Sequence, residues 1–278
     1  MHHPVSGSAI PPPVPPVPAP RPGSLQGRTV VVTRARAQAS GLVRRLADLG
    51  AAVVELPVIA IEDPADGGAA LAAATDRAVS GAYEWVVVTS GNAVARVVDA
   101  LGGRALPAST RWAAVGTSTA KALMIRGLVP DLVPERAVSD ALVEVFPLAR
   151  PHGTEPRRGT VAGAALFVRA ERVRAVVSPG LAAKGWQVDE AIAYRTVAGV
   201  VAPDAAARAS AADAVAFTSS STVERTVDLL GVAGVPPVVV SIGPVTSEAA
   251  RAVGLAVTAE ATPHTLEGLV AAVVAALT

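Results

Sequence analysis

The chain has 278 residues, a length that favours two lobes of roughly 100 to 130 residues each over a single domain. Hydrophobic residues make up 51% of it but occur in short runs, and no run approaches the ~20 apolar residues that cross a bilayer. A net charge of +1 and 3% aromatic residues argue against a nucleic-acid groove, and the lack of cysteine excludes disulfides and sulfur-based zinc sites. Because the N-terminus shows no secretion signal, we expect a cytoplasmic protein.

The first segment is rich in proline. Residues 10–22 read IPPPVPPVPAPRP, and proline at this density disfavours helices and sheet ladders while favouring an extended chain. We therefore predict that residues 1–26 form a disordered Pro-rich leader outside the fold. A docking ligand for a partner that recognises proline-rich chains is the alternative.

From residue 27 onward, short β-branched runs alternate with helical patterns. The run TVVVT at residues 29–33 is typical of a buried strand, and a helical pattern at residues 39–49 ends at Gly50. Further strands are predicted at residues 52–61, 85–89, 165–168, 188–197, 214–218 and 238–242. Further helices are predicted at residues 93–101, after Gly116 to near Gly127, and at residues 266–277. This alternation indicates right-handed βαβ units, so we predict an α/β fold with parallel sheets.

Comparison of the chain with itself reveals an internal duplication. Three blocks recur with the same local pattern at nearly constant offsets. The offsets are 135 for Arg34 and Arg169, 129 for Thr89-Ser90 and Thr218-Ser219, and 127 for Gly116 and Thr119 with Gly243 and Thr246. We therefore predict two similar lobes, with a large ligand bound between them. The residues alone leave open whether the lobes lie in tandem or whether one is discontinuous.

Each repeated block places Ser, Thr or Gly between a strand and a helix. The first-turn N–H groups of a helix lack intrahelical partners, so such turns are able to bind carboxylates. Simple N-capping, worth about 1 kcal/mol per residue, is the alternative. The candidate positions are Thr89, Ser90, Gly116, Thr117, Thr218, Ser219, Ser220, Gly243 and Thr246, with Ser139 and Thr265 before later helices. Arg34 and Arg169, at strand ends in the two halves, are further binding candidates.

The ordered set of blocks resembles the uroporphyrinogen-III synthase family from Arg28 to Leu277. The matching pieces are TRARAQASGL, VVVTSGNAV, WAAVGTSTAKAL, LFVRAERVR, IAYRT, AFTSSSTV, SIGPVTSEAA and ATPHTLEGL. No single piece is specific, but their order is. The resemblance implies two similar doubly wound parallel-sheet lobes joined by a two-stranded antiparallel connector. It assigns residues 27–58 and 196–278 to a discontinuous first α/β lobe and residues 62–191 to a second α/β lobe.

The resemblance also implies a substrate and a reaction. The substrate is hydroxymethylbilane, a linear tetrapyrrole rich in carboxylates, and a cyclising lyase step closes it with inversion of the last pyrrole ring. Spontaneous closure gives the type I isomer, so the enzyme must act mainly by holding the substrate folded. The family's candidate proton donor is a tyrosine, which matches Tyr194 in the predicted connector. A phenol with an ordinary pKa of about 10 is protonated at pH 7 and can donate to a leaving hydroxyl, although packing in a strand is the alternative role.

No cofactor or metal is expected. No histidine pairs with another at ligand spacing, and neither GxGxxG, a GK[ST] phosphate loop nor GxSxG occurs. We expect a monomer whose partners are its substrate and, transiently, the preceding enzyme of the pathway. Two other readings stay open: an anion-binding sensor that closes between two lobes, and a sugar-phosphate isomerase, which lacks an evident base in the repeated turns.

Overall fold

The computed structural model describes residues 20–149 and 163–278 of the chain. Most of the Pro-rich segment predicted at residues 1–26 lies outside this described part. The end of that segment belongs to the fold, contrary to the prediction: Leu25 is completely buried, and its N–H donates to the Leu49 carbonyl oxygen at 2.9 Å. The dense prolines end at Pro22, and the leucine that follows packs in the same core as helix α1 (Arg36–Asp48).

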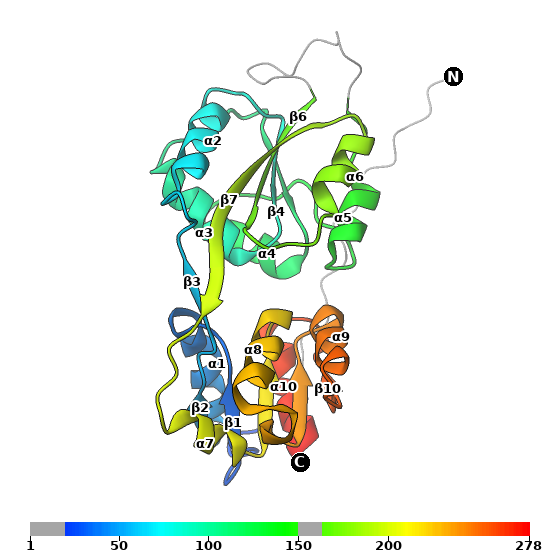
Figure 1. The fold of residues 1–278 in the computed structure, drawn as a ribbon. Helices are drawn as coiled ribbons and strands as arrows, with labels where there is room; N and C mark the ends of the chain where they lie inside the picture. The colour runs from blue at the N-terminus through cyan, green and yellow to red at the C-terminus, as the bar shows by residue number, and fades with distance from the viewer. Residues whose placement is uncertain (1–19, 150–162) are drawn as a thin grey trace, which may run out of the picture.

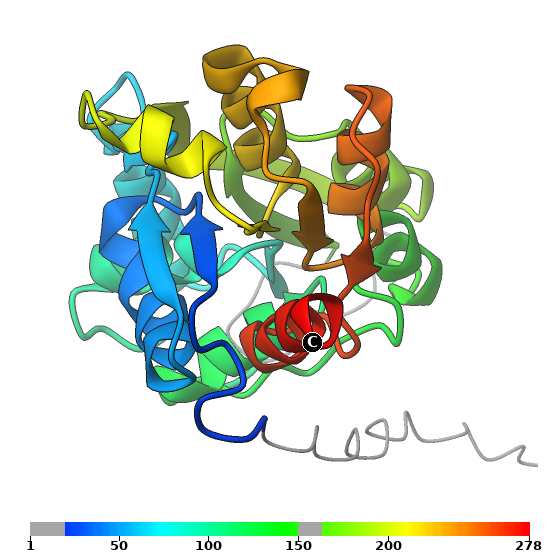
Figure 2. The same ribbon diagram turned by 90° about the horizontal axis from the view of Figure 1, so that it is seen from below.

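Five parallel strands form the first of two sheets, in the order β10-β9-β8-β1-β2 (Figure 1). They are β1 (Thr29–Val32), β2 (Ala52–Glu55), β8 (Ala214–Phe217), β9 (Val238–Ser241) and β10 (Ala259–Glu260). Helices α1 and α10 (Leu266–Leu277) pack on one face of this sheet. The other face carries α7 (Ala205–Ser210), α8 (Ser220–Leu230) and α9 (Pro244–Ala252), as Figure 2 shows, with a short 3-10 helix, η1 (Val232–Gly234), after α8. These elements are the first lobe.

The second sheet has the order β3-β7-β6-β4-β5 and is parallel except for β3. Its strands are β3 (Ile59–Glu62), β4 (Trp85–Val88), β5 (Arg111–Ala114), β6 (Ala164–Ala170) and β7 (Gln187–Ala198). One face is covered by α2 (Ala69–Val79), α3 (Gly91–Leu101) and α4 (Thr117–Ile125), the other by α5 (Ser139–Val145) and α6 (Val177–Ala183). These elements are the second lobe. The predicted fold class, two doubly wound lobes with mostly parallel sheets, is confirmed.

The offsets found in the sequence carry the strand pairing of one lobe onto the other. Thr29 pairs with Ala52 between β1 and β2, and the same pair 135 residues later is Ala164 with Gln187, between β6 and β7. The registers between β1 and β8 and between β8 and β9 likewise recur between β6 and β4 and between β4 and β5. The internal duplication is therefore one of structure as well as of sequence.

Strands β3 and β7 form the antiparallel connector between the lobes (Figure 1). The extended segment predicted at residues 52–61 is divided, because β2 ends at Glu55 and β3 begins at Ile59. Pro57 lies between them, and without an N–H it cannot continue a sheet ladder. Gly199, just after β7, packs so closely that a Cβ atom there would lie 1.8 Å from the Pro57 carbonyl oxygen. The chain thus crosses between the sheets at a tightly packed point.

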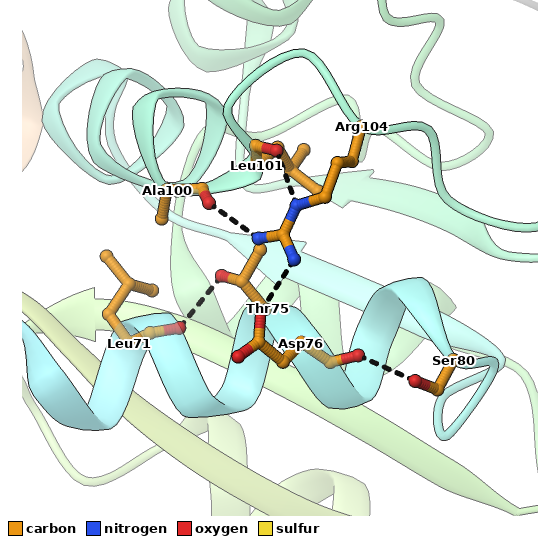
Figure 3. Close-up of polar contacts among 7 residues, drawn as sticks. All are labelled: Leu71, Thr75, Asp76, Ser80, Ala100, Leu101 and Arg104. Atoms are coloured by element: carbon orange, nitrogen blue, oxygen red, sulfur yellow. Dashed lines mark hydrogen bonds and ion pairs between the residues drawn. The ribbon is translucent and has the colours of Figure 1, made fainter.

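Arg104 fastens the C-terminal end of α3 to α2 (Figure 3). Its guanidinium donates to the carbonyl oxygens of Leu101 and Ala100 at 2.9 and 3.0 Å and to Asp76 Oδ1 at 2.7 Å. Carbonyl groups at a helix C-terminus lack intrahelical partners, so this contact caps α3 and holds its axis against α2. Ser90, at the opposite end, is the N-cap of α3.

Candidate active site

The carboxyl ends of the strands in both sheets face each other across the connector. Strand β2 leads into β3 of the other sheet, and the remaining strands of the first lobe run parallel to β2. Strand β7 runs back toward the first lobe, and β4, β5 and β6 run parallel to it (Figure 1). The turns after β4, β5, β8 and β9 therefore lie on the sides of the lobes that face one another. Ligands of open parallel sheets bind at this edge.

In the second lobe, two predicted turns begin helices at this edge. Thr89 and Ser90 follow β4, and Ser90 is the N-cap of α3, whose side chain accepts from the Ala93 N–H at 3.1 Å. Gly116 follows β5 as the N-cap of α4, and Thr117 is the exposed first residue of that helix. The Gly116 N-cap has no side chain, so first-turn amides of α4 are left without a side-chain partner.

The equivalent turns of the first lobe begin α8 and α9. Ser219 caps α8 and accepts from the Thr222 N–H at 3.4 Å, directly after Thr218. Ser220 donates to the Val245 carbonyl oxygen at 3.2 Å and so joins the start of α8 to the start of α9. Gly243 is the N-cap of α9. Thr246 is buried, so only its backbone remains for contact with a ligand.

Thr265 and Ser139, the two candidates predicted before later helices, differ in their place at the helix start. Thr265 is the N-cap of α10, and its side chain accepts from the Gly268 N–H at 3.2 Å. Ser139 was predicted to precede a helix but is the first residue of α5, whose N-cap is Val138. The hydroxyl of Thr265 is therefore engaged in capping, whereas Ser139 caps nothing.

Tyr194 lies in β7 and is brought against one of the predicted turns. Tyr194 is 7% exposed and packs in the core that α2, α3 and α4 share with the sheet. Its hydroxyl oxygen lies 3.0 Å from Ser90 Oγ, although the two residues are 104 positions apart in the chain. The predicted proton donor and a predicted binding turn thus meet at the edge that faces the first lobe.

The two predicted arginines have different surroundings. Arg34 follows β1, and burial lowers the pKa of its guanidinium, which nevertheless stays charged at neutral pH. Arg169 contacts Glu190 through Nε at 2.5 Å and donates from Nη1 to the carbonyl oxygens of Ala170 and Glu171. Burial acts to raise the pKa of Glu190, but hydrogen bonds from Ser178 and Arg169 and the Arg169 charge outweigh it and lower this pKa. A substrate carboxylate would have to compete with Glu190 for Arg169.

Two open cavities of the second lobe carry arginines that the sequence patterns did not single out. One, of about 690 Å³, is lined by Arg96 and Arg195, which are ion-paired with acidic residues of the same cavity. The other, of about 370 Å³, lies beside Arg169 and includes Arg172 and Arg174 from the loop after β6. The piece RAERVR held the signal for this second group, since it follows a strand at the carboxyl edge.

His264 is a further residue that the sequence patterns missed. A Cβ atom on Gly243 would lie 3.3 Å from the His264 ring, so the imidazole packs over the start of α9. Its Nδ1 lies 2.9 Å from the Ala261 carbonyl oxygen, which can only accept, so Nδ1 is the protonated nitrogen in this contact. Within residues 20–149 and 163–278, no group of His, Cys, Asp or Glu side chains is arranged to hold a metal ion. The same described part contains no helix long and apolar enough to span a bilayer.

Comparisons with known proteins agree with this architecture. The family described as uroporphyrinogen-III synthase HemD matches residues 40–271 of the chain. A uroporphyrinogen-III synthase of Synechococcus elongatus is 31% identical over 273 residues, which cover 90% of this chain and 95% of that protein. A porphyrin biosynthesis protein HemD of Ruminiclostridium josui is 35% identical over 115 residues, which cover 40% of this chain and 22% of that protein.

Solved structures share the fold at lower identity. A mutant uroporphyrinogen III synthase of Thermus thermophilus has a TM-score of 0.61 at 20% identity, covering 90% of this chain and 98% of that one. A uroporphyrinogen-III synthetase of Helicobacter pylori has a TM-score of 0.54 at 14% identity, covering 89% and 99%. These likenesses concern the fold alone, whereas the family match and the Synechococcus relative each span most of the chain. The chain belongs to the uroporphyrinogen-III synthase family, the cyclising lyases of tetrapyrrole biosynthesis.

Proposed function

We propose that this protein converts hydroxymethylbilane into uroporphyrinogen III by holding it between the facing edges of its two sheets while Tyr194 protonates the departing hydroxyl. One observation carries the assignment of the donor: the Tyr194 hydroxyl lies 3.0 Å from Ser90, at the edge of the second sheet where α3 and α4 begin. This edge faces the edge of the first sheet where α8 and α9 begin. Membership of the family removes the sensor and isomerase alternatives.

The turns at this edge supply binding groups for a polyanion. A helix N-terminus carries unpaired N–H groups and roughly half a positive charge, so it stabilises a carboxylate placed against it. Each lobe contributes one turn capped by serine and one capped by glycine, at Ser90, Gly116, Ser219 and Gly243. Acetates and propionates spread along the substrate can therefore be held from both sides at once. Arg34 and Arg169 are proposed to add charged contacts at the edges of this set.

Confinement explains the isomer that forms. When the hydroxyl leaves as water, the tetrapyrrole becomes an electrophilic azafulvene, and either α-carbon of the last ring could attack it. Holding the chain folded presents the substituted carbon, and a spiro intermediate then reopens and recloses with the ring inverted. Because the uncatalysed reaction already proceeds to the type I isomer, orientation is the main contribution of the enzyme. The proton from Tyr194 assists departure of the hydroxyl.

The test is the Tyr194→Phe variant. Hydroxymethylbilane is incubated with protein, and type I and type III products are separated and timed. We expect wild-type protein to give type III in excess, and the variant to turn over severalfold or more slowly with its stability changed by no more than about 1 kcal/mol. A variant with unchanged kcat would remove Tyr194 from the mechanism.

A monomeric state, a place in the cytoplasm and transient contact with the preceding enzyme of the pathway are also part of the proposal. The reactivity of the substrate supports such a contact, because hydroxymethylbilane closes spontaneously to the wrong isomer when it is free. Size-exclusion chromatography, cell fractionation and cross-linking to the preceding enzyme test the three points in turn.

A further inference from the structure

Ser90 has a hydroxyl whose hydrogen bonds are only partly used by capping. Its Oγ accepts from the Ala93 N–H at 3.1 Å and lies 3.0 Å from the Tyr194 hydroxyl oxygen, where either group can be the donor. A serine hydroxyl has one proton to donate and two lone pairs to accept with. With one lone pair occupied by Ala93, the proton of Ser90 is available for Tyr194.

We infer that Ser90 is a positioning residue for proton transfer, whose O–H donates to Tyr194 and turns the phenol proton toward the departing hydroxyl. This inference rests on the proposed role of Tyr194. In the reverse arrangement, with Tyr194 donating to Ser90, the phenol proton would be turned away from the substrate. The N-cap contact from Ala93 is compatible with either direction of the Ser90–Tyr194 hydrogen bond. The direction is therefore determined by the step in which Tyr194 loses its proton.

The reaction itself selects the arrangement in which Ser90 donates. The proton moves from Tyr194 to the hydroxyl oxygen, the C–O bond breaks with its electron pair leaving on water, and a phenolate develops. Ser90 stabilises that phenolate when it donates the hydrogen bond but not when it accepts it. A hydrogen bond to a charged group is also stronger than one to a neutral group. The contact is therefore stronger in the transition state than in the ground state, which is the requirement for raising kcat. When the closed product loses a proton and becomes aromatic again, that proton restores the phenol.

The first lobe provides the comparison that separates this role from capping. Ser219 caps α8 as Ser90 caps α3, but its Oγ lies 3.0 Å from Ser221 Oγ, and both tyrosines of the chain, Tyr83 and Tyr194, lie in the second lobe. Both serines serve the start of a helix at the facing edge, yet only Ser90 also reaches a phenol. Capping alone thus does not require the Tyr194 contact.

The experiment uses the full chain and variants that keep the cap. Glycine caps helices nearly as well as serine, as Gly116 and Gly243 do here, so Ser90→Gly removes the hydroxyl with little effect on α3. We expect Ser90→Gly to lower kcat about three- to tenfold with a smaller change in KM, because only the transition state loses an interaction. Ser90→Thr, which keeps a hydroxyl, should restore most of kcat. The matched Ser219→Gly is expected to act mainly on KM.

Combining Ser90→Gly with Tyr194→Phe distinguishes the inferred role of Ser90 from the proposed role of Tyr194. If Ser90 acts through the phenol, Ser90→Gly has no further effect on kcat in the Tyr194→Phe background. An equal loss in both backgrounds, or an unchanged kcat in Ser90→Gly alone, overturns the inference while leaving the role of Tyr194 intact. An unchanged kcat in Tyr194→Phe alone overturns the role of Tyr194 and this inference with it. Thermal unfolding of each variant identifies any loss of activity that comes from loss of folded protein.

Discussion

Gly116 and Gly243 occupy equivalent turns in the two lobes, but the space beside them differs. A Cβ atom on Gly116 would lie 2.5 Å from Ala137 Cβ and 3.1 Å from its Cα, whereas one on Gly243 would lie 3.3 Å from the His264 ring. Both residues have extended backbone, with φ of −175° at Gly116 and 171° at Gly243, so alanine meets no conformational penalty at either position. Any cost of Gly→Ala is therefore steric.

The distances set the size of the effect. Carbon atoms rest at about 3.5–4.0 Å from one another, so Gly116→Ala requires Ala137 and its loop to move by about 1 Å, whereas His264 needs to move by only a few tenths. Overpacking of this kind costs about 1–3 kcal/mol. Because Ala137 lies in an exposed loop that can yield in part, we expect Gly116→Ala to lose about 1–2 kcal/mol. For Gly243→Ala, where a side chain can rotate away, we expect less than about 1 kcal/mol.

Urea unfolding of the two variants beside wild-type protein measures the difference. The shifted loop leads into α5 beside a proposed carboxylate-binding turn, so Gly116→Ala should also raise KM for hydroxymethylbilane more than Gly243→Ala does. If Gly116→Ala is as stable as wild type, or if Gly243→Ala is the more damaging change, the close approach between Gly116 and Ala137 does not govern this turn.

Two further predictions concern a buried carboxylate, Glu84, and a tyrosine, Tyr83, which lie away from the edges where the two lobes face each other. Glu84 is completely buried and accepts from the Gly163 N–H at 2.9 Å, so Glu84→Ala should cost about 3 kcal/mol in urea unfolding, and a loss below about 1 kcal/mol would contradict this. Asp213 lies 129 residues after Glu84, at the equivalent position of the repeat, but it is partly exposed, and Asp213→Ala should cost only about 1 kcal/mol. Burial, with the hydrogen bond to Asp189, raises the pKa of Tyr83 to about 12. Because the unfolded tyrosine titrates near pH 10, the folded state binds this proton more tightly, and about 1–2 kcal/mol of stability, reduced by solvent screening, is lost between about pH 10 and 12. Tyr83→Phe should remove that part of the alkaline slope, and an unchanged slope would refute the assignment.

Local pattern was sufficient to predict most strands, because buried parallel strands such as β4 and β8 are uninterrupted runs of apolar residues. The sequence repeats indicated more than two similar lobes, because their offsets also relate the strand-pairing registers of one sheet to those of the other. Helix α2 was missed because its alanine-rich sequence follows two glycines, and the side chain that caps it, Asp66, lies before those glycines and accepts from the Ala70 N–H at 2.8 Å. The extended segment predicted at residues 52–61 is divided near Pro57. Sequence alone did not predict this division, because it depends on β2 and β3 joining different sheets.

Long-range contacts at the site could not be read from spacing. The pairing of Ser90 with Tyr194 joins residues that the fold brings together from β7 and the turn after β4. The engagement of Arg169 by Glu190 depends on the register between β6 and β7, which only the tertiary structure fixes. Residue type therefore indicated which chemistry was available, and packing decided which groups are free to perform it.

The central claim is that one polyanionic substrate is held by helix N-termini of both lobes at once. Its most direct test is a titration of isotopically labelled protein with a hydroxymethylbilane analogue that lacks the terminal hydroxyl and cannot cyclise. We expect the amide resonances of the turns after β4 and β5 and of those after β8 and β9 to shift together, along a single saturation curve. Shifts confined to the turns of one lobe, or separate curves for the two lobes, would contradict the claim.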